Sequence, residues 1–132
     1  MGKRNLFVVL LTCAVFLLTV TSFAQSVKDQ VVSESVINVT VGENIVIILE
    51  SNRTTGYLWR LGSDLNDDKI EFVKSNYFAS KTKLLGAPGK ETWIFKALKP
   101  GRLTLVFEYR RPWEKKLKPI KIENFTIIIK EK

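Results

Sequence analysis

The sequence predicts an all-β protein, an immunoglobulin-like β-sandwich of about seven strands, and three observations support this prediction. Seven short segments are rich in β-branched and aromatic residues, and several of them alternate apolar with polar positions. Polar, glycine- or proline-containing turns separate these segments. No segment has a convincing helical period. Seven strands in a domain of about 100 residues are typical of an immunoglobulin-like sandwich.

The first four predicted strands have different local patterns. Val31 to Val39 alternates loosely, and Asn44 to Glu50 contains a run of β-branched residues. Such residues favour the pleated, half-buried surface of a sheet. Tyr57 to Leu61 alternates around Trp59, and Ile70 to Phe78 follows a polar stretch. We expect Trp59 to lie in the core, because it sits within an alternating strand.

The last three predicted strands complete the sandwich. Glu91 to Leu98 carries Trp93, which we also assign to the core. Arg102 to Arg110 places an apolar residue at every second position, and Pro119 to Lys130 ends in an apolar, β-branched run. We find no repeat and no low-complexity linker, so the strands are expected to form one domain.

The N-terminal segment has the pattern of a secretory signal peptide. An apolar stretch from Leu6 to Val20 follows a positively charged start, and small residues precede a cut after Ala24. The stretch is too short and too near the start for an ordinary spanning helix. We therefore expect a signal peptide at 1–24 and an exported domain at 25–132, secreted or periplasmic, with no integral membrane segment after cleavage.

A lipoprotein anchored at Cys13 is the alternative, and two features argue against it. Thr12 is not the usual small residue before a lipidated cysteine, and the apolar stretch continues beyond Cys13. Cys13 is also the only cysteine, so the predicted mature chain contains no disulfide, although its compartment would permit one. A chain of about 100 residues can bury a core without such a link.

The composition of the mature chain argues against an enzyme. The sequence has no histidine, and its only cysteine lies in the predicted signal peptide. Most nucleophilic, general-base and zinc chemistry uses one of these residues. The acidic segment from Asp64 to Glu71 suggests a calcium loop, but Lys69 and Ser75 occupy positions where an EF-hand needs glycine and glutamate. We expect no metal and no cofactor.

The charge of the chain points to acidic partners. It has 21 lysines and arginines and 13 aspartates and glutamates, a formal net charge of +8. The predicted signal peptide holds two of the basic residues and no acidic ones, which leaves the mature chain at +6. A basic protein is attracted to acidic surfaces. Charge alone would allow nucleic acid, but predicted export and scattered lysines argue against it, and we expect no nucleic-acid partner.

Three unusual connections are expected at the same end of the sandwich. If each strand crosses the sandwich once, successive connections alternate between the two ends. The second, fourth and sixth connections then share one end, and these are Ser51 to Gly56, Ser80 to Lys90 and Arg111 to Lys118. Loops presented by a rigid sandwich are a common recognition surface.

Each of these loops has a structural and a functional interpretation. Gly56 is expected to supply a positive φ before the third strand, and Thr54 and Thr55 could simply form local turns. The glycines of the second loop could allow a close approach to a partner or only make a turn. Trp113 follows a proline among basic residues at a hairpin tip, and an exposed tryptophan beside arginine is typical of an interface.

The three loops, in this order, resemble the chagasin family of cysteine protease inhibitors. That family shows an Asn-Pro-Thr-Thr-Gly-aromatic-x-Trp segment, a glycine-rich loop and an Arg-Pro-Trp motif on an immunoglobulin-like sandwich. The corresponding segments are Asn52-Arg53-Thr54-Thr55-Gly56-Tyr57-Leu58-Trp59, Gly86-Ala87-Pro88-Gly89 and Arg111-Pro112-Trp113. Each motif alone is weak, but three in order are fairly specific.

The resemblance implies a reversible inhibitor of papain-like cysteine proteases that binds as a monomer, one to one, without a cofactor. The first loop would enter the catalytic cleft, with Thr54 and Thr55 near the catalytic cysteine and histidine of the target. The other two loops would flank it, with Trp113 on the primed side. The implied protease-binding residues are Asn52, Arg53, Thr54, Thr55, Gly56, Leu85, Gly86, Ala87, Pro88, Gly89, Arg111, Pro112 and Trp113.

Two positions depart from the family pattern. Arg53 replaces the usual proline, which should cost about 0.5–1 kcal/mol of rigidity and adds a charge that could favour acidic clefts. Pro88 stands where many members carry glycine. Arg53 also makes Asn52 part of an N-glycosylation sequon, and Asn38 and Asn124 begin two others. Our hypothesis is that Asn52 is unmodified in active protein.

The same loops leave other functions open. The main alternative is an exported adhesion or carbohydrate-binding sandwich that uses the three loops for a different ligand. A third is an accessory domain that stabilises a partner in the cell envelope. Inhibition of papain separates the first interpretation from the other two.

Overall fold

The structure, a computed structural model, describes residues 31–62, 64–82 and 84–132. The expected signal peptide at 1–24, with Cys13, lies outside these residues. The elements are β1 (Val31–Thr40), β2 (Asn44–Ser51), the 3₁₀ helix η1 (Arg53–Thr55), β3 (Leu58–Leu61), β4 (Ile70–Phe78), β5 (Gly89–Ala97), β6 (Gly101–Arg110) and β7 (Lys121–Lys130). The seven predicted strands are confirmed to within two residues at each end, whereas η1 was not predicted.

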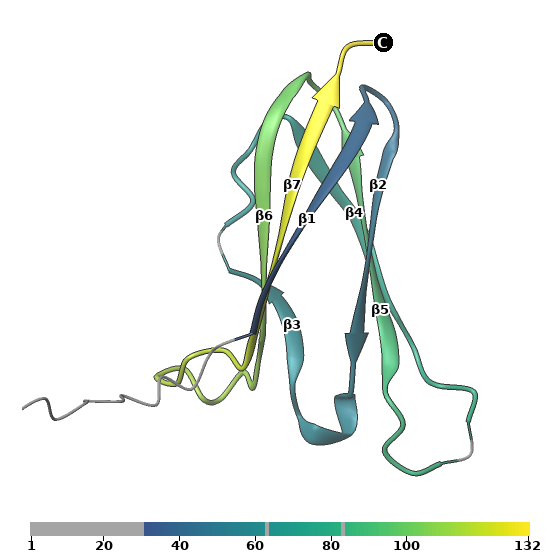
Figure 1. Cartoon of the computed structure of the whole chain (residues 1–132), viewed down its shortest axis with the longest axis vertical. Helices are drawn as coiled ribbons and strands as arrows, with labels where there is room; N and C mark the ends of the chain where they lie inside the picture. The colour runs from purple at the N-terminus through teal and green to yellow at the C-terminus, as the bar shows by residue number, and fades with distance from the viewer. Residues whose placement is uncertain (1–30, 63, 83) are drawn as a thin grey trace, which may run out of the picture.

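The strands form two sheets that face each other (Figure 1). One sheet has the order β1-β7-β6-β3, and the other has the order β2-β5-β4. The pair β1–β7 is parallel, and every other pair is antiparallel. Within the described ranges, no helix is long and apolar enough to cross a membrane.

The core lies between the two sheets and follows the alternation of the strands. In β2 the buried and exposed positions alternate without exception, and β6 buries every second residue from Leu103 to Tyr109. Phe107 is fully buried, and its ring meets those of Trp93 and Phe125 edge to face. Burying one such side chain stabilises a domain by about 1.5–3 kcal/mol. Trp59 is buried as predicted, whereas Trp93 is only half-buried against the core.

The strand directions place the β2–β3, β4–β5 and β6–β7 loops at one end of the sandwich. Figure 1 shows these loops at the lower end, opposite the C-terminus. The arrangement follows because each successive strand reverses direction. The gathering of the three unusual loops, expected from the parity of the connections, is therefore confirmed.

Candidate functional site

The β2–β3 loop is a tight turn built by its own side chains. The side-chain oxygen Oδ1 of Asn52 accepts hydrogen bonds from the backbone N–H and the hydroxyl of Thr54, at 3.3 and 2.5 Å. The hydroxyl of Thr55 donates to the carbonyl oxygen of Asn52 at 2.7 Å. Gly56 ends η1 with a φ of +78°, the left-handed conformation expected of it. The turn thus holds Thr54 and Thr55 in place while both stay exposed.

An aromatic cluster fixes this turn from below. The backbone N–H of Asn52 donates to the hydroxyl of Tyr109 in β6 at 2.8 Å. The Tyr109 ring packs between those of Tyr57 and Trp59, with centroids 5.4 and 4.8 Å away. The indole N–H of Trp59 in turn donates to the carbonyl oxygen of Glu50 at 2.8 Å. Both ends of the turn are therefore tied to the rigid sandwich.

On one side, Arg53 tethers the turn to the β2-β5-β4 sheet. Its Nε lies 3.4 Å from the carboxylate of Glu91, and its guanidinium lies 4.3 Å from the ring centre of Tyr77. Glu91 is buried, and the same carboxylate oxygen accepts a hydrogen bond from the buried hydroxyl of Ser51 at 2.8 Å. Arg53 was expected to loosen the loop. The structure instead gives its side chain a restraining contact, although about half of that side chain is exposed.

On the other side, the β6–β7 loop holds the turn through Arg111 and Trp113. The Nε of Arg111 donates to the carbonyl oxygen of Thr55 at 3.1 Å, and its guanidinium lies 4.5 Å from the ring centre of Tyr57. Trp113 covers Gly56 so closely that a Cβ atom built there would lie 2.5 Å from the indole. The indole is nevertheless 66% exposed. Trp113 therefore packs on the central loop and also presents an open face, which unites the two interpretations made from the sequence.

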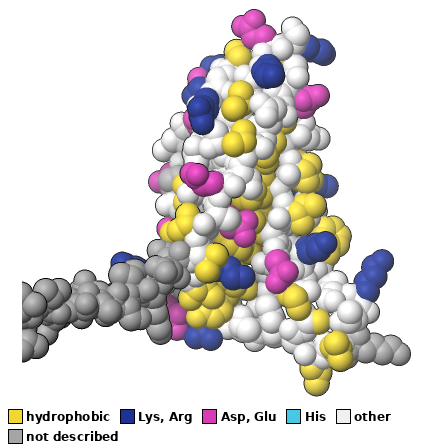
Figure 2. All heavy atoms as spheres, viewed as in Figure 1, with side chains coloured by type: hydrophobic (Ala, Val, Ile, Leu, Met, Phe, Trp, Pro, Cys, Tyr) yellow, Lys and Arg dark blue, Asp and Glu magenta, His cyan; other side chains and the backbone are white. Residues whose placement is uncertain are grey.

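The β4–β5 loop contributes an apolar tip. Leu84 and Leu85 are strongly exposed, and Figure 2 shows hydrophobic side chains at the lower right tip of the molecule. Gly86 has a φ of +78°, and its carbonyl oxygen accepts a hydrogen bond from Nδ2 of Asn52 at 3.0 Å. This bond connects the apolar tip to the central turn.

The remaining predicted residues of this loop differ in exposure. Pro88 is exposed and Ala87 is half-buried. Gly89 is buried at the start of β5, where a Cβ atom would collide with the carbonyl oxygen of Phe78 and the ring of Tyr77. Gly89 thus allows close packing between β4 and β5, and it does not lie at the loop tip.

Sequence reasoning missed the residues that support the loops, namely Tyr77, Glu91 and Tyr109. Glu91 carried a signal, because it shares the inward-facing parity of Trp93 and Phe95, where a carboxylate needs a partner. Its partner Arg53 is distant in sequence and could not be identified from the pattern.

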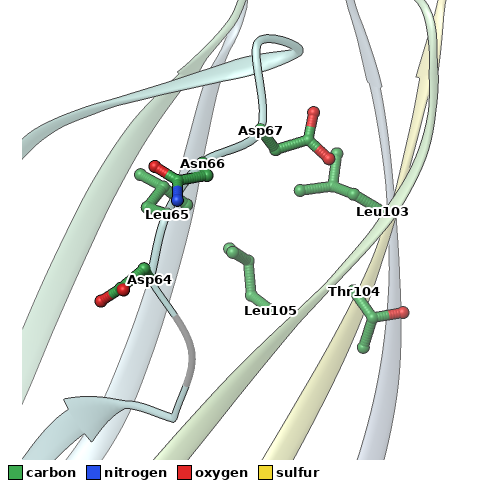
Figure 3. Close-up of a pocket in the computed structure, with 7 residues that line it drawn as sticks. All are labelled: Asp64, Leu65, Asn66, Asp67, Leu103, Thr104 and Leu105. Atoms are coloured by element: carbon green, nitrogen blue, oxygen red, sulfur yellow. The ribbon is translucent and has the colours of Figure 1, made fainter.

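A hollow of about 360 Å³ lies at the side of the sandwich between β6 and the segment that follows β3. Figure 3 shows Leu103 and Leu105 pointing from β6 toward this segment. Asp67 pairs with the Lys69 ammonium at 3.1 Å. The Lys99 ammonium, hydrogen-bonded to Asp68 at 2.6 Å, holds the pKa of the Asp68 carboxyl below its usual range. In the described part of the chain, no three acidic, histidine or cysteine side chains are grouped to hold a metal ion.

Comparison with known proteins identifies one family. The model of the chagasin family of peptidase inhibitors matches residues 38–129. The chain is similar to chagasin of Trypanosoma cruzi, with 35% identity over 80 residues, 58% of this chain and 73% of chagasin. Its fold is similar to the crystal structure of the Entamoeba histolytica cysteine protease inhibitor EhICP2, with a TM-score of 0.60 and 24% identity, covering 75% of this chain and 97% of that one. The structure of PbICP-C in complex with falcipain-2 is also similar, with a TM-score of 0.51 and 25% identity over 79% of this chain and 93% of that one.

Proposed function

The chain belongs to the chagasin family of peptidase inhibitors and is an inhibitor of cysteine proteases, and from this premise we propose how its loops block a papain-like target. The β2–β3 loop enters the catalytic cleft, and the β4–β5 and β6–β7 loops contact its two walls. Binding is reversible, one to one, and needs no cofactor. The names of its relatives favour inhibition over adhesion or carbohydrate binding.

One observation carries this assignment: the central turn is braced from both sides by the loops that flank it. Asn52 contacts Gly86 of the β4–β5 loop, and Thr55 accepts a hydrogen bond from Arg111 of the β6–β7 loop. Association orders side chains and loops at a cost of about 0.5–1.5 kcal/mol for each side chain immobilised. Loops that are already braced avoid much of this cost.

The exposed groups divide the work between the three loops. Thr54 and Thr55 occupy the narrow central turn, which suits the mouth of a catalytic cleft. Leu85 and Trp113 offer apolar surface on either side of it, and a tryptophan at the centre of such a contact can contribute about 2 kcal/mol or more. The compact turn also resists cleavage, because it is not held as an extended peptide in attack geometry.

Titration of papain and a cathepsin tests this proposal. We expect stoichiometric, reversible inhibition, and we expect the double variant Thr54→Ala, Trp113→Ala to lose most of it while still folding and unfolding cooperatively. The matched control, Thr104→Ala with Leu98→Ala, removes an exposed threonine and an exposed apolar residue far from the three loops and should inhibit like wild type. Wild-type inhibition by the loop variant would refute the proposed loop roles.

Export is part of the same proposal. A secreted or periplasmic inhibitor would meet proteases outside the cytoplasm, and the signal-like pattern of residues 1–24 supports this location. Sequencing the N-terminus of protein recovered from the cell envelope or medium should give a chain that begins at Gln25. Recovery of full-length chain from the cytoplasm would contradict it.

A further inference from the structure

The β6–β7 loop is folded around a single arginine. The Nη2 of Arg110 donates to the carbonyl oxygens of Glu114, Lys115 and Leu117, at 3.3, 3.2 and 2.7 Å. Its Nη1 contacts the carboxylate of Glu108 at 3.2 Å. Three backbone carbonyls therefore converge on one edge of a half-buried guanidinium. This arrangement fixes the course of the loop, in which Trp113, Lys115, Lys116 and Lys118 are exposed.

The basic side chains of this loop fall into two groups. Arg111 is engaged, because its guanidinium pairs with Glu114 at 3.2 Å and also contacts the central turn. Lys115, Lys116 and Lys118 are all exposed. None of the ion pairs found among the described residues includes them. We call these three residues the lysine cluster.

Within the β6–β7 loop itself, acidic charge does not offset this cluster. The carboxylate of Glu91 is buried beneath Arg53, and Glu114 is paired with Arg111. The acidic residues Asp67 and Asp68 lie in the segment leading into β4, away from the loops (Figure 1), and each is paired with a lysine. The β6–β7 loop, all of which the structure describes, therefore presents three exposed lysines, outside every ion pair, beside the exposed face of Trp113.

We infer that the lysine cluster selects among papain-like proteases, favouring those whose cleft wall beneath the β6–β7 loop carries carboxylates. This inference rests on the proposed function and adds the chemistry of the preferred partner. Exposed charges contribute little to the strength of a formed contact, but they steer a partner of opposite charge during encounter. The cluster therefore acts on the rate of association, and its effect weakens as salt screens it.

Association kinetics test the inference with matched charge changes. The loop variant is Lys115→Gln, Lys116→Gln, Lys118→Gln, and the control is Lys96→Gln, Lys130→Gln, Lys132→Gln, which removes three exposed lysines near the opposite end. Both are measured by stopped flow against an acidic and a basic papain-like protease that wild type inhibits. The ionic strength runs from roughly 0.01 to 1 M, over which the Debye length falls from about 30 to 3 Å.

Against the acidic protease at low salt, the loop variant should associate about tenfold more slowly than wild type, with a nearly unchanged dissociation rate. The association rate of the control variant should differ from that of wild type by less than about twofold. The difference should disappear at high salt and be absent or reversed for the basic protease.

Three results would overturn the inference. Equal association rates for the loop variant and wild type at low salt would show that the cluster does not steer. Wild type could instead bind phosphatidylserine vesicles, and the loop variant could lose this binding while its association with the protease stays unchanged. This result would show that the lysine cluster binds membranes and does not steer proteases. Absence of inhibition by wild type would overturn the proposed function together with the inference, whereas intact inhibition with equal rates overturns the inference alone.

Discussion

Restoring the family's proline at position 53 should destabilise this protein. The backbone suits the change, because Arg53 is the first residue of η1 and proline is tolerated at the first position of a helix. Asn52 before it has φ −112° and ψ 89°, outside the helical region that proline disfavours in its neighbour. The variant Arg53→Pro would, however, remove the contact with Glu91.

The stabilisation expected from proline and the loss of the Arg53–Glu91 contact can be compared as free energies. Where the native backbone suits it, proline stabilises a fold by about 0.4–1 kcal/mol by restricting the unfolded chain. Two charges separated by the 3.4 Å between Arg53 and Glu91 would interact by about 5 kcal/mol at an effective dielectric constant of 20. Because the Arg53 side chain is 48% exposed, solvent screening reduces this to about 1–2 kcal/mol. The variant also leaves the Glu91 carboxylate, 5% exposed, with Ser51 as its remaining hydrogen-bond partner among the described residues.

We therefore expect a net loss of about 1 kcal/mol, which lowers the melting temperature of a domain of this size by about 4–8 °C. A double-mutant cycle with Glu91→Gln, followed by thermal unfolding at neutral pH, measures the coupling. The double variant Arg53→Pro, Glu91→Gln should melt above Arg53→Pro alone, because no charge is stranded. If Arg53→Pro alone raised the melting temperature and the cycle gave no coupling, the contact between Arg53 and Glu91 would not stabilise the fold.

Three further predictions follow from the loops and from one strand. The variant Gly56→Ala should lower the free energy of unfolding by about 1–2 kcal/mol because of the positive φ at this position, and it should also displace Trp113. Calorimetry would measure the first effect, and weaker inhibition of papain would reveal the second. Unchanged inhibition would contradict the contact between Gly56 and Trp113. Burial raises the pKa of the Glu123 carboxyl, so the folded state binds that proton more tightly and the stability of the fold decreases as pH rises through this pKa. The variant Glu123→Gln should therefore raise the melting temperature at neutral pH but not below the ordinary glutamate pKa of about 4.3. A gain in melting temperature that does not depend on pH would refute this cause. In protein secreted from a eukaryotic host, mass spectrometry should find the exposed Asn38 glycosylated and Asn52 unmodified in inhibitory molecules. The reason is that Nδ2 of Asn52 donates a hydrogen bond to the β4–β5 loop. A glycan on Asn52 in fully inhibitory protein would contradict this prediction.

The strands and the loop-bearing end could be predicted because they depend on local patterns. Alternation in β6 and the β-branched run in β2 specify strands regardless of what they pack against. Strand parity then requires only a count of connections, and the exposure of Trp113 follows from its place at a hairpin tip. These features needed no knowledge of which strands pair.

The contact between Arg53 and Glu91 could not be predicted because it depends on the register of β5 with its neighbouring strands. Glu91 stands opposite Leu49 in β2 and Tyr77 in β4, and this pairing brings its carboxylate under the turn that begins after Ser51. A shift of one residue would turn Glu91 to the other face of the sheet. The same limit applies to Arg110, whose carbonyl partners are chosen by the path of the loop and not by any motif.

The contact between Gly56 and Trp113 limits how these loops can be exchanged between relatives. The β2–β3 and β6–β7 loops share this contact and the bond from Arg111 to the Thr55 carbonyl, so each is part of the other's support. A chimera that receives only one of the two would place a foreign tryptophan against an unmatched turn, or leave a native turn without its cover. Retargeting this scaffold therefore requires transplanting the two loops as a single unit, with the β4–β5 loop as the more independent site for variation.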